Sequence, residues 1–516
     1  MNELELLAHA DVRGRRYTEG NGQRRVFPSE EAIAALAAFD ESLPALGLPA
    51  EATLALLDDV GSPATTASNG PRYFGFVIGA ALPAAAAAER LMLAWDQCAS
   101  TFDNSPVSAT VERVAARWVL DALDLPRDSA VGFGTSATAC TLTALAAARR
   151  ELLARQGWDF DGQGLHGAPE IRVVVSALVH TTVKKALRVL GFGLNQIIHA
   201  PVDAQGRVDV AQLPTLDART ILCLQAGEVN TGAFDPFAQI LPHARAAGAW
   251  VHVDGAFGLW ARASSLAHLT QGIELADSWT TDAHKWLNTP YDCAMAICRD
   301  ARVLAEAMNS DAAYSSASVD AQKNLTLEFS RRPRGIPVWA ALRSLGRQGV
   351  AELVERHCAQ ARRIGEGLAQ AGFEVLNTVT LNQVLFRCAT DAHTHAVRAA
   401  VQASGEAWFG GTLWQERPAM RISVSSWRTR DEDVEALLAL LERVGQESAV
   451  GRSGPGAPAG QAGAVCPGCT FVTPPVRSPD RFPAPAGRCC CPAWGPGSES
   501  CPPPVRPRCS PWPAVR

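Results

Sequence analysis

The sequence contains very little lysine. Of its 47 basic residues only four are lysines, namely Lys184, Lys185, Lys285 and Lys323. A GC-rich coding sequence is enough to explain this bias. Chemistry that requires a primary amine nevertheless has only these four candidate side chains, because a guanidinium group does not act as a Schiff-base amine at neutral pH.

The chain also lacks an excess of positive charge and a long apolar segment. A net charge of −5 provides no basic stripe for phosphates, so we expect no nucleic-acid partner. Glu89 and Arg90 interrupt the run ALPAAAAAERLML before it reaches the roughly 20 residues that cross a bilayer. The first residues, MNELELLAHADVRGRRY, lack the order of a secretory signal. We therefore expect a cytoplasmic protein without a membrane partner.

Composition changes abruptly near residue 448. The stretch from Val450 to Arg516 holds 16 of the 33 prolines and seven of the 14 cysteines, which predicts a disordered tail over residues 448–516. Cys466-Pro-Gly-Cys469 resembles half of a zinc site, but the tail offers no second pair at a usual spacing. We expect no metal site. The other seven cysteines are scattered singly, so we expect no disulfide framework.

Residues 1–447 have the pattern of an α/β protein. Helical periodicity appears in EEAIAALAAFDESL, VERVAARWVLDAL, TLTALAAARRELLARQ and VEALLALLERV, and short apolar runs lie between them: IRVVVSA, TILCLQA, WVHVDGA and CAMAICR. This alternation predicts a largely parallel, buried sheet that binds ligands beyond the carboxyl ends of its strands. We divide this part into an N-terminal helical segment (1–80), a large domain (81–345) and a small C-terminal domain (346–447).

Asp254 ends one of the apolar runs. In WVHVDGAFG it is followed by small residues, so its carboxylate should lie at the ligand edge of the sheet with space in front of it. A buried carboxylate needs a partner, since an unpaired one would be costly. The alternative is a structural aspartate that caps the next helix.

Lys285 lies between His284 and Trp286 in DAHKWLN. A lysine that bulky rings partly desolvate is a better nucleophile toward carbonyls, although a surface lysine is the simpler alternative. The pair formed with Asp254 is more informative. A carboxylate that keeps a pyridinium nitrogen protonated and a lysine that forms a Schiff base are the two protein groups that pyridoxal phosphate (PLP) requires.

A candidate phosphate site precedes a predicted helix. In GFGTSATA, starting at Gly132, small residues let backbone amides approach an anion and the helix N-terminus adds partial positive charge. The alternative is dinucleotide binding, because the segment fits G-x-G-x-x-[GA]. That motif requires a preceding strand, and DLPRDSAV makes a poor one. His180, after the run IRVVV, is either a core histidine or one that stacks on a planar cofactor.

The order of these motifs resembles that of the group II PLP-dependent amino acid decarboxylases, which include the aromatic amino acid, glutamate and diaminobutyrate decarboxylases. The resemblance covers roughly residues 65–447. It is carried by PRYFGFVIGAALPAA, SPVSATVERVAARWV, VHVDGAFG, HKW, SRRPRGIPVWAALRSLG and MRISVSSW.

The resemblance implies the PLP-dependent transferase fold (aspartate-aminotransferase-like, fold type I), with a small C-terminal α/β domain and a homodimeric assembly. It implies decarboxylation of an L-amino acid to the amine through an external aldimine, with catalytic roles for Lys285, His180 and Asp254. The cofactor-binding residues that it implies are Ser136, Ala137, Thr138, His180, Asp254, Ala256, His284 and Lys285.

Some positions depart from the family pattern. Where aromatic members have a loop tyrosine, counting back from Trp339 reaches Gln322, and the nearest tyrosine is Tyr314. Gly227-Glu-Val229 stands where relatives often have Gly-Thr-Thr. These departures leave open an aldehyde synthase or oxidative deaminase, another PLP-dependent lyase, or a degenerate PLP-fold interaction protein. Arg334 and Arg421 are candidate partners for a substrate carboxylate, because arginine binds carboxylates with two parallel hydrogen bonds.

Overall fold

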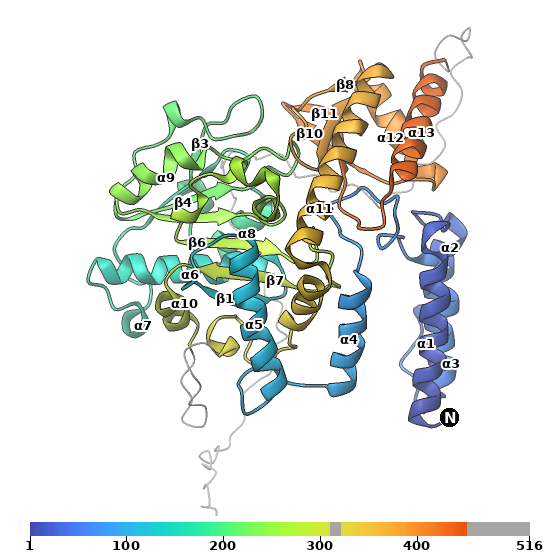
Figure 1. Cartoon of the computed structure of the whole chain (residues 1–516), viewed down its shortest axis with the longest axis horizontal. Coiled ribbons are helices and arrows are strands. Elements are labelled where there is room, and N and C mark those ends of the chain that lie inside the picture. Colours follow the sequence, from blue (N-terminus) through green and yellow to red (C-terminus); the bar gives the residue numbers. More distant parts are fainter. Residues whose placement is uncertain (310–320, 451–516) are drawn as a thin grey trace, which may run out of the picture. The chain divides into compact units, whose positions relative to one another are not determined.

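The computed structural model describes residues 1–309 and 321–450, and the side chains of 448–450 are not described (Figure 1). Tyr314 and the Pro- and Cys-rich tail with Cys466 and Cys469 lie outside the described residues. The described chain holds a seven-stranded sheet with helices on both faces and a separate four-stranded sheet.

The large sheet is mostly parallel. Its strands are β1 (Ala130–Gly134), β2 (Arg172–Ser176), β3 (Ile198–Ala200), β4 (Thr220–Gln225), β5 (Trp250–Asp254), β6 (Ser278–Asp282) and β7 (Ala294–Cys298). In the order β1-β7-β6-β5-β4-β2-β3, only β7 runs antiparallel to its neighbours. The four apolar runs correspond to β2, β4, β5 and β7, so the predicted fold class is confirmed.

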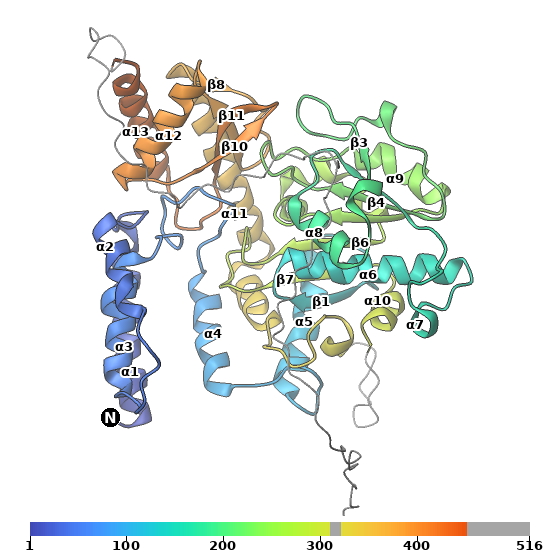
Figure 2. The same cartoon turned by 180° about the vertical axis from the view of Figure 1, so that it is seen from behind.

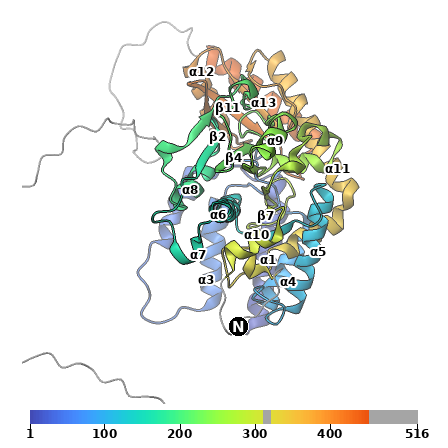
Figure 3. The same ribbon diagram turned by 90° about the vertical axis from the view of Figure 1, so that its left-hand side faces the viewer.

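Helices cover both faces of this sheet. The first face packs against α6 (Ala137–Arg155), α8 (Thr181–Val189) and α10 (Ala301–Met308), and the second against α5 (Pro106–Ala122), α9 (Phe237–Ala246) and α11 (Gly335–Gln370). Strand residues alternate between the two cores: Val173 and Val175 join the first, Val174 the second. Figure 3 shows α6 and α8 on one side of the strands and α5 and α11 on the other.

The small sheet is antiparallel and has one helical layer. Its strands are β8 (Glu374–Val375), β9 (Gln383–Arg387), β10 (Gly410–Trp414) and β11 (Arg417–Ser423), in the order β10-β11-β9-β8. They pack with α12 (Asp391–Ser404), α13 (Asp431–Val450) and the second half of α11 (Figure 2). The α11 helix breaks at Gly346 (φ 63°, ψ −178°), where we propose that the large domain ends.

The N-terminal segment exposes its helices. No residue of α1 (Glu3–Glu19), α2 (Glu30–Ala35) or α3 (Ala50–Leu56) is buried. α1 is held to the turn after α3 by ion pairs from Arg13 to Asp58 and Asp59. α4 (Pro83–Trp95) follows and packs against α11. No helix in the described part of the chain is long and apolar enough to cross a membrane.

Strand β1 lies mainly within the predicted phosphate segment. Of the residues DLPRDSAV, only Ala130 and Val131 belong to β1, which also contains Gly132 and Gly134. The two glycines that suggested a dinucleotide motif therefore lie within a strand and not in a turn after it. Gly132 is required for packing, since a Cβ there would collide with the carbonyl of Leu325.

Gln322 pairs with the free edge of β1. Its Oε1 accepts from the amide of Phe133 at 2.9 Å, and its Nε2 donates to the carbonyl of Val131 at 3.0 Å. The side chain is buried, and it satisfies two backbone groups that the edge strand would otherwise leave unpaired. Gln322 is therefore a structural residue of the large sheet.

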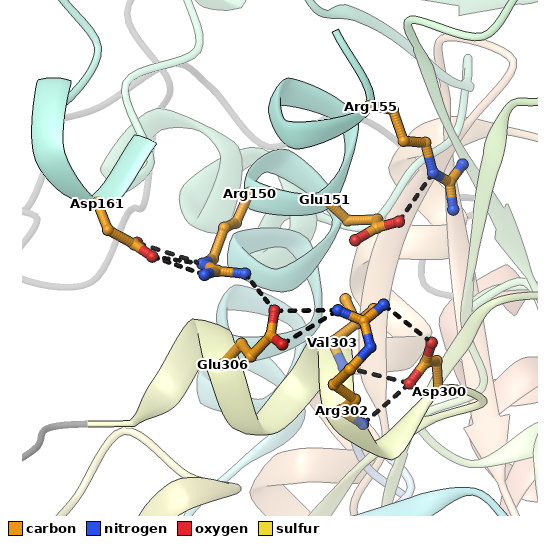
Figure 4. A network of polar contacts seen from close by, with 8 residues as sticks. All are labelled: Arg150, Glu151, Arg155, Asp161, Asp300, Arg302, Val303 and Glu306. Carbon is orange, nitrogen blue, oxygen red and sulfur yellow. Dashed lines mark hydrogen bonds and ion pairs between the residues drawn. The ribbon is translucent and has the colours of Figure 1, made fainter. Parts of the chain in front are cut away.

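A surface network joins α6, α10 and the short helix α7 (Phe160–Gln163). Arg150 on α6 binds Asp161 at 2.6 Å and Glu306 at 2.7 Å, and Glu306 also binds Arg302 at 3.1 Å (Figure 4). Exposed pairs of this kind contribute about 0.2–1 kcal/mol each. The network therefore orients α10 more than it stabilises the fold.

Candidate active site

The predicted site residues gather where four strands end. β1, β4, β5 and β6 run in the same direction, so their carboxyl ends meet at one edge of the sheet. A cavity of about 160 Å³ opens there, lined by Ser136, Ala137, Thr138, His180, Thr182, Gln225, Gly227, Val229, Asp254, Ala256, Phe257, Asp282 and Lys285. A larger cavity of about 400 Å³ beside α5 contains none of the predicted residues.

Asp254 presents its carboxylate to this cavity. It is the last residue of β5 and is only 7% exposed. Its Oδ1 accepts from the amide of Ala256 at 3.1 Å, and β5 pairs it with Gln225 at the end of β4. The carboxylate thus bonds the backbone two residues further along the chain. Asp254 does not cap the next helix, because that helix is preceded by Phe257 as its N-cap.

Lys285 carries its amine into the same cavity. Its Nζ lies 3.1 Å from Oδ2 of Asp282, and its side chain is 21% exposed. The neighbouring Trp286 is buried, and its Nε1 donates to Nδ1 of His357 on α11 at 2.9 Å. The lysine therefore sits on a turn that is anchored to α11 from one side.

The start of α6 forms one wall. Ser136 caps the helix, and its Oγ accepts from the amide of Ala139 at 3.3 Å. The amide of Ala137 donates to Oδ1 of Asp282 at 2.7 Å. Ser136, Ala137 and Thr138 line the cavity at the N-terminus of this 19-residue helix, which carries partial positive charge.

His180 lies across the cavity at the start of α8. Its Nδ1 is 2.7 Å from Oγ1 of Thr182, and the ring caps the helix. Burial lowers the pKa of His180, while the carboxylate of Asp254 opposes that shift. The imidazole is therefore held neutral near physiological pH, as suits a ring that packs against another ring.

His284 does not line the cavity. Its ring stacks on Tyr291 at 4.2 Å, and its Nδ1 accepts from the amide of Cys293 at 3.1 Å. Burial lowers its pKa, and Asp282 opposes the shift. Of the eight residues expected to bind the cofactor, the structure thus brings seven to one cavity. The Nε2 of His284 instead lies 3.6 Å from Oδ1 of Asp282.

Several lining residues were not foreseen as site residues. Gln225, Thr182, Phe257 and Asp282 all line the cavity. A signal for two of them was present, because Gln225 and Asp282 end strands β4 and β6 as Asp254 ends β5. The rule that ligands bind beyond strand ends would have selected them.

Lys323 differs from expectation. Its neighbours in the sequence, AQKNLT, are mostly polar, yet it is 3% exposed and its Nζ donates to Oδ1 of Asn324 at 3.0 Å. The ammonium also lies 5.4 Å from the ring centre of Phe329. Burial alone therefore does not single out Lys285 among the four lysines, whereas its place in the cavity does.

The other departures from the family pattern have structural partners. The buried carboxylate of Glu228 accepts from the amides of Asn230 and Thr231 at 2.8 Å, and it stabilises the loop that presents Val229 to the cavity. Burial raises the pKa of Glu228, and these hydrogen bonds oppose the shift.

The two candidate arginines differ. Arg334 is paired with Asp292 at 3.0 Å. Arg421 on β11 donates from Nη1 to the carbonyl of Val229 at 3.0 Å, which puts it behind a residue that lines the cavity. Arg421 is therefore the one placed near the site.

The residues present fit PLP. The buried Nε2 of Gln225 has no hydrogen-bond partner in the described chain and lines the cavity. A side chain at Gly227 (φ +94°) would place its Cβ 2.9 Å from the ring of Phe257, so the wall is shaped by glycine there. A helix N-terminus suits the phosphate, and Asp254 suits a pyridine nitrogen. Within the described residues, no group of three His, Cys, Asp or Glu side chains could hold a metal ion.

Comparisons with known proteins agree with this fit. A model of the pyridoxal-dependent decarboxylase conserved domain matches residues 37–389. L-2,4-diaminobutyrate decarboxylase from Rhizobium meliloti is 27% identical over 389 residues, or 70% of this chain and 75% of the relative. Phenylacetaldehyde synthase from a Rosa hybrid cultivar is 27% identical over 360 residues, or 64% and 68%. The crystal structure of Oryza sativa TDC with PLP and tryptamine aligns with a TM-score of 0.79 at 24% identity, over 87% of this chain and 99% of that one.

Proposed function

The chain belongs to the pyridoxal-dependent decarboxylase family and is a PLP-dependent amino acid decarboxylase, and we propose that it acts through Lys285, Asp254 and His180. The observation that carries this proposal is their placement in one cavity. The amine of Lys285, the carboxylate of Asp254 and the N-terminus of α6 all face the same 160 Å³ space. They are the three partners that the aldehyde, the ring nitrogen and the phosphate of the cofactor require.

Bound there, PLP supplies the electron sink that accepts the electron pair released when carbon dioxide leaves. Asp254 would keep the ring nitrogen protonated, because a carboxylate beside a cation favours its charged form. His180 would pack against the ring as a neutral imidazole. Lys285 would hold the cofactor through its amine. Ser136, Ala137, Thr138 and Ala256 complete the walls, and His284 lies beside Asp282.

Arg421 is our candidate for the substrate carboxylate. It is the nearer of the two candidate arginines, since it donates to the carbonyl of Val229 at the cavity wall. The guanidinium also acts electrostatically on His180. A bidentate partner at this position would orient the substrate before decarboxylation.

The test is a product screen with the PLP-loaded protein. Candidate substrates are L-tryptophan, L-tyrosine, L-DOPA and L-2,4-diaminobutyrate, the amino acids named for relatives. We expect carbon dioxide and amine in equal amounts from at least one L-amino acid and none from the Lys285→Ala variant. The screen also includes the common L-amino acids. If none of the amino acids tested yields carbon dioxide, the proposal is rejected.

A second outcome has specific support. Aldehyde synthases are among the similar proteins, and Gln322, at the position of the loop tyrosine of aromatic members, is bound to β1 and does not line the cavity. An aldehyde synthase would consume dioxygen and water and would release aldehyde, ammonia and hydrogen peroxide with the carbon dioxide. Measuring amine, aldehyde and ammonia in the same screen therefore separates the two activities.

We also propose a homodimer in the cytoplasm. Large apolar side chains of the N-terminal segment are exposed, including Leu43 (95%) and Leu46 (83%), and they need a partner surface. A second copy of the chain is the occupant we propose. The seven described cysteines carry free thiols, which is typical of reducing compartments.

A further inference from the structure

Asp282 holds two parts of the active site with one carboxylate. It is the last residue of β6 and is 2% exposed. Oδ1 accepts from the amide of Ala137 at 2.7 Å, and Oδ2 lies 3.1 Å from Nζ of Lys285. Oδ1 also lies 3.6 Å from Nε2 of His284, and the charge of Asp282 acts on His180 and Tyr291. The first turn of α6 and the amine of Lys285 are therefore joined through this side chain.

The backbone of Asp282 is fixed as well. Its amide donates to the carbonyl of Ala256 at 2.9 Å, and its carbonyl accepts from Nε1 of Trp260 at 3.3 Å. A carboxylate held at both main-chain groups and at both oxygens cannot turn away. It acts as a fixed negative charge beside the lysine.

Asp254, in the same cavity, has a different environment. Its carboxylate accepts one hydrogen bond, from the amide of Ala256, and forms no ion pair within residues 1–309 and 321–450. Asp282 thus balances the positive charge of Lys285, and the carboxylate of Asp254 remains able to pair with a different cation. The two aspartates therefore interact with different positive charges.

We propose that Asp282 is a positioning residue that stabilises the nitrogen of Lys285 in its protonated form after the lysine has joined the cofactor, a proposal that rests on the role given above to Lys285. In that step a carbon–nitrogen double bond forms to the cofactor aldehyde, the carbonyl oxygen leaves as water, and no electrons are transferred. The nitrogen keeps a proton and its positive charge. A carboxylate about 3 Å away favours that charge.

The proposal has a second consequence for the phosphate. Asp282 brings a negative charge close to the proposed phosphate site, because its carboxylate accepts from the first amide of α6. The positive charge of Lys285 offsets this negative charge. Removing only the charge of Asp282 should therefore not weaken phosphate binding. Removing only the charge of Lys285 should weaken it.

The first test is Asp282→Asn in the PLP-loaded protein. The asparagine oxygen still accepts from Ala137, so the shape is kept while the charge is lost. We expect the midpoint pH of the absorbance change of the bound cofactor to fall by about one unit or more. We expect the affinity for pyridoxine 5′-phosphate, which has no aldehyde, to stay within about threefold or to rise.

Asp277→Asn is the matched control at the other end of β6. Asp277 accepts from the amide of Val251 at 2.8 Å and is remote from the cavity, so neither quantity should change. A purely structural role of Asp282 would lower the affinity and the melting temperature and leave the midpoint pH in place. An unchanged or higher midpoint in Asp282→Asn would overturn the proposal.

A second variant covers the case in which Asp282→Asn does not fold. In Lys285→Met the carboxylate loses its counter-charge, so we expect the affinity for pyridoxine 5′-phosphate to fall by about three- to tenfold. Equal or tighter binding would overturn the proposal. A separate measurement tests the role of Lys285 itself. If Lys285 does not hold the cofactor, borohydride treatment of the unaltered protein will attach the cofactor to a different lysine or to none.

Discussion

Two buried aspartates at neighbouring strand ends show how local contacts assign different tasks to one residue type. The carboxylate of Asp254 accepts a hydrogen bond from one backbone amide, and Asp254 lines the cavity. The carboxylate of Asp282 instead accepts from a backbone amide at one oxygen and lies beside the ammonium group of Lys285 at the other. Sequence position alone makes them equivalent, since both end a strand. The difference arises from α6 and from Lys285, which approach only one of them.

Replacing Asp254 by asparagine tests its task. The amide cannot hold a proton on the cofactor ring nitrogen by charge, so we expect the rate of carbon dioxide release to fall by about 10²–10³-fold. The measurement is kcat at saturating substrate, together with cofactor content from the absorbance of the denatured protein. Asp277→Asn should retain the unaltered rate. A full cofactor content with less than a tenfold loss in Asp254→Asn would show that this carboxylate is dispensable.

His357 makes stability sensitive to acid. Its Nδ1 accepts from Trp286, its Nε2 lies 2.9 Å from the carbonyl of Ser426, and burial lowers its pKa to about 3. Below a pH of about 6.5 the unfolded chain takes up a proton that the folded chain does not, so the free energy of unfolding falls by up to about 1.4 kcal/mol per pH unit.

His357→Gln keeps an acceptor and a donor but does not titrate. Urea unfolding of both proteins between pH 7 and pH 4 should therefore show a steeper loss of stability for the unaltered chain below pH 6.5. His252, whose pKa burial also lowers to about 3, is present in both and cancels from the difference. Parallel pH profiles would argue against a neutral His357.

At the scale of elements, the edge of β1 is completed by a side chain. The strand pairs with β7 on one side, and Gln322 satisfies Val131 and Phe133 on the other. The contacts span 189 and 191 residues, so no local sequence pattern could reveal this role of Gln322. The same long range explains why β1 itself was missed: two of its five residues are glycines, and its partner lies far along the chain.

Gln322→Ala should cost stability. Two buried backbone groups lose their partners, so we expect a loss of about 1–3 kcal/mol in the free energy of unfolding. Hydrogen exchange at the amide of Phe133 should become faster. Gln348→Ala is the control, because Gln348 bonds only an exposed glutamate. An unaltered stability with a changed ratio of amine to aldehyde would instead place Gln322 in the reaction.

At the scale of the whole molecule, the sequence predicted more of the large sheet than of its surroundings. Strands that are buried on both faces are largely apolar, and the parallel β2, β4 and β5 and the antiparallel β7 were recognised for that reason. Asp254, His180 and the α6 start were found because each lies at or just after the end of an apolar run or at the start of a helix. Lys285 was found because it is one of only four lysines and lies between His284 and Trp286. The contact between Ala137 and Asp282 joins residues 145 apart, so no local pattern could reveal it.

The exposed N-terminal segment predicts a dimer. Light scattering should give a mass near twice 54.7 kDa. Replacing Leu43 and Leu46 by serine should weaken dimerisation by about tenfold or more. The reason is that the dimer would then no longer bury the two apolar side chains that are exposed in the single chain. Leu413→Ser, on the 70% exposed Leu413 of β10, should leave the dimer intact. A monomer at micromolar concentration in the unaltered protein would contradict the assembly.

One lysine of the four should carry the cofactor. Borohydride reduction of the PLP-loaded protein, followed by peptide mapping, identifies the lysine that carries it. We predict the pyridoxyl group on Lys285 alone, because its amine faces the cavity that Asp254 and the start of α6 line. A label on the buried Lys323, or on no lysine, would contradict the account.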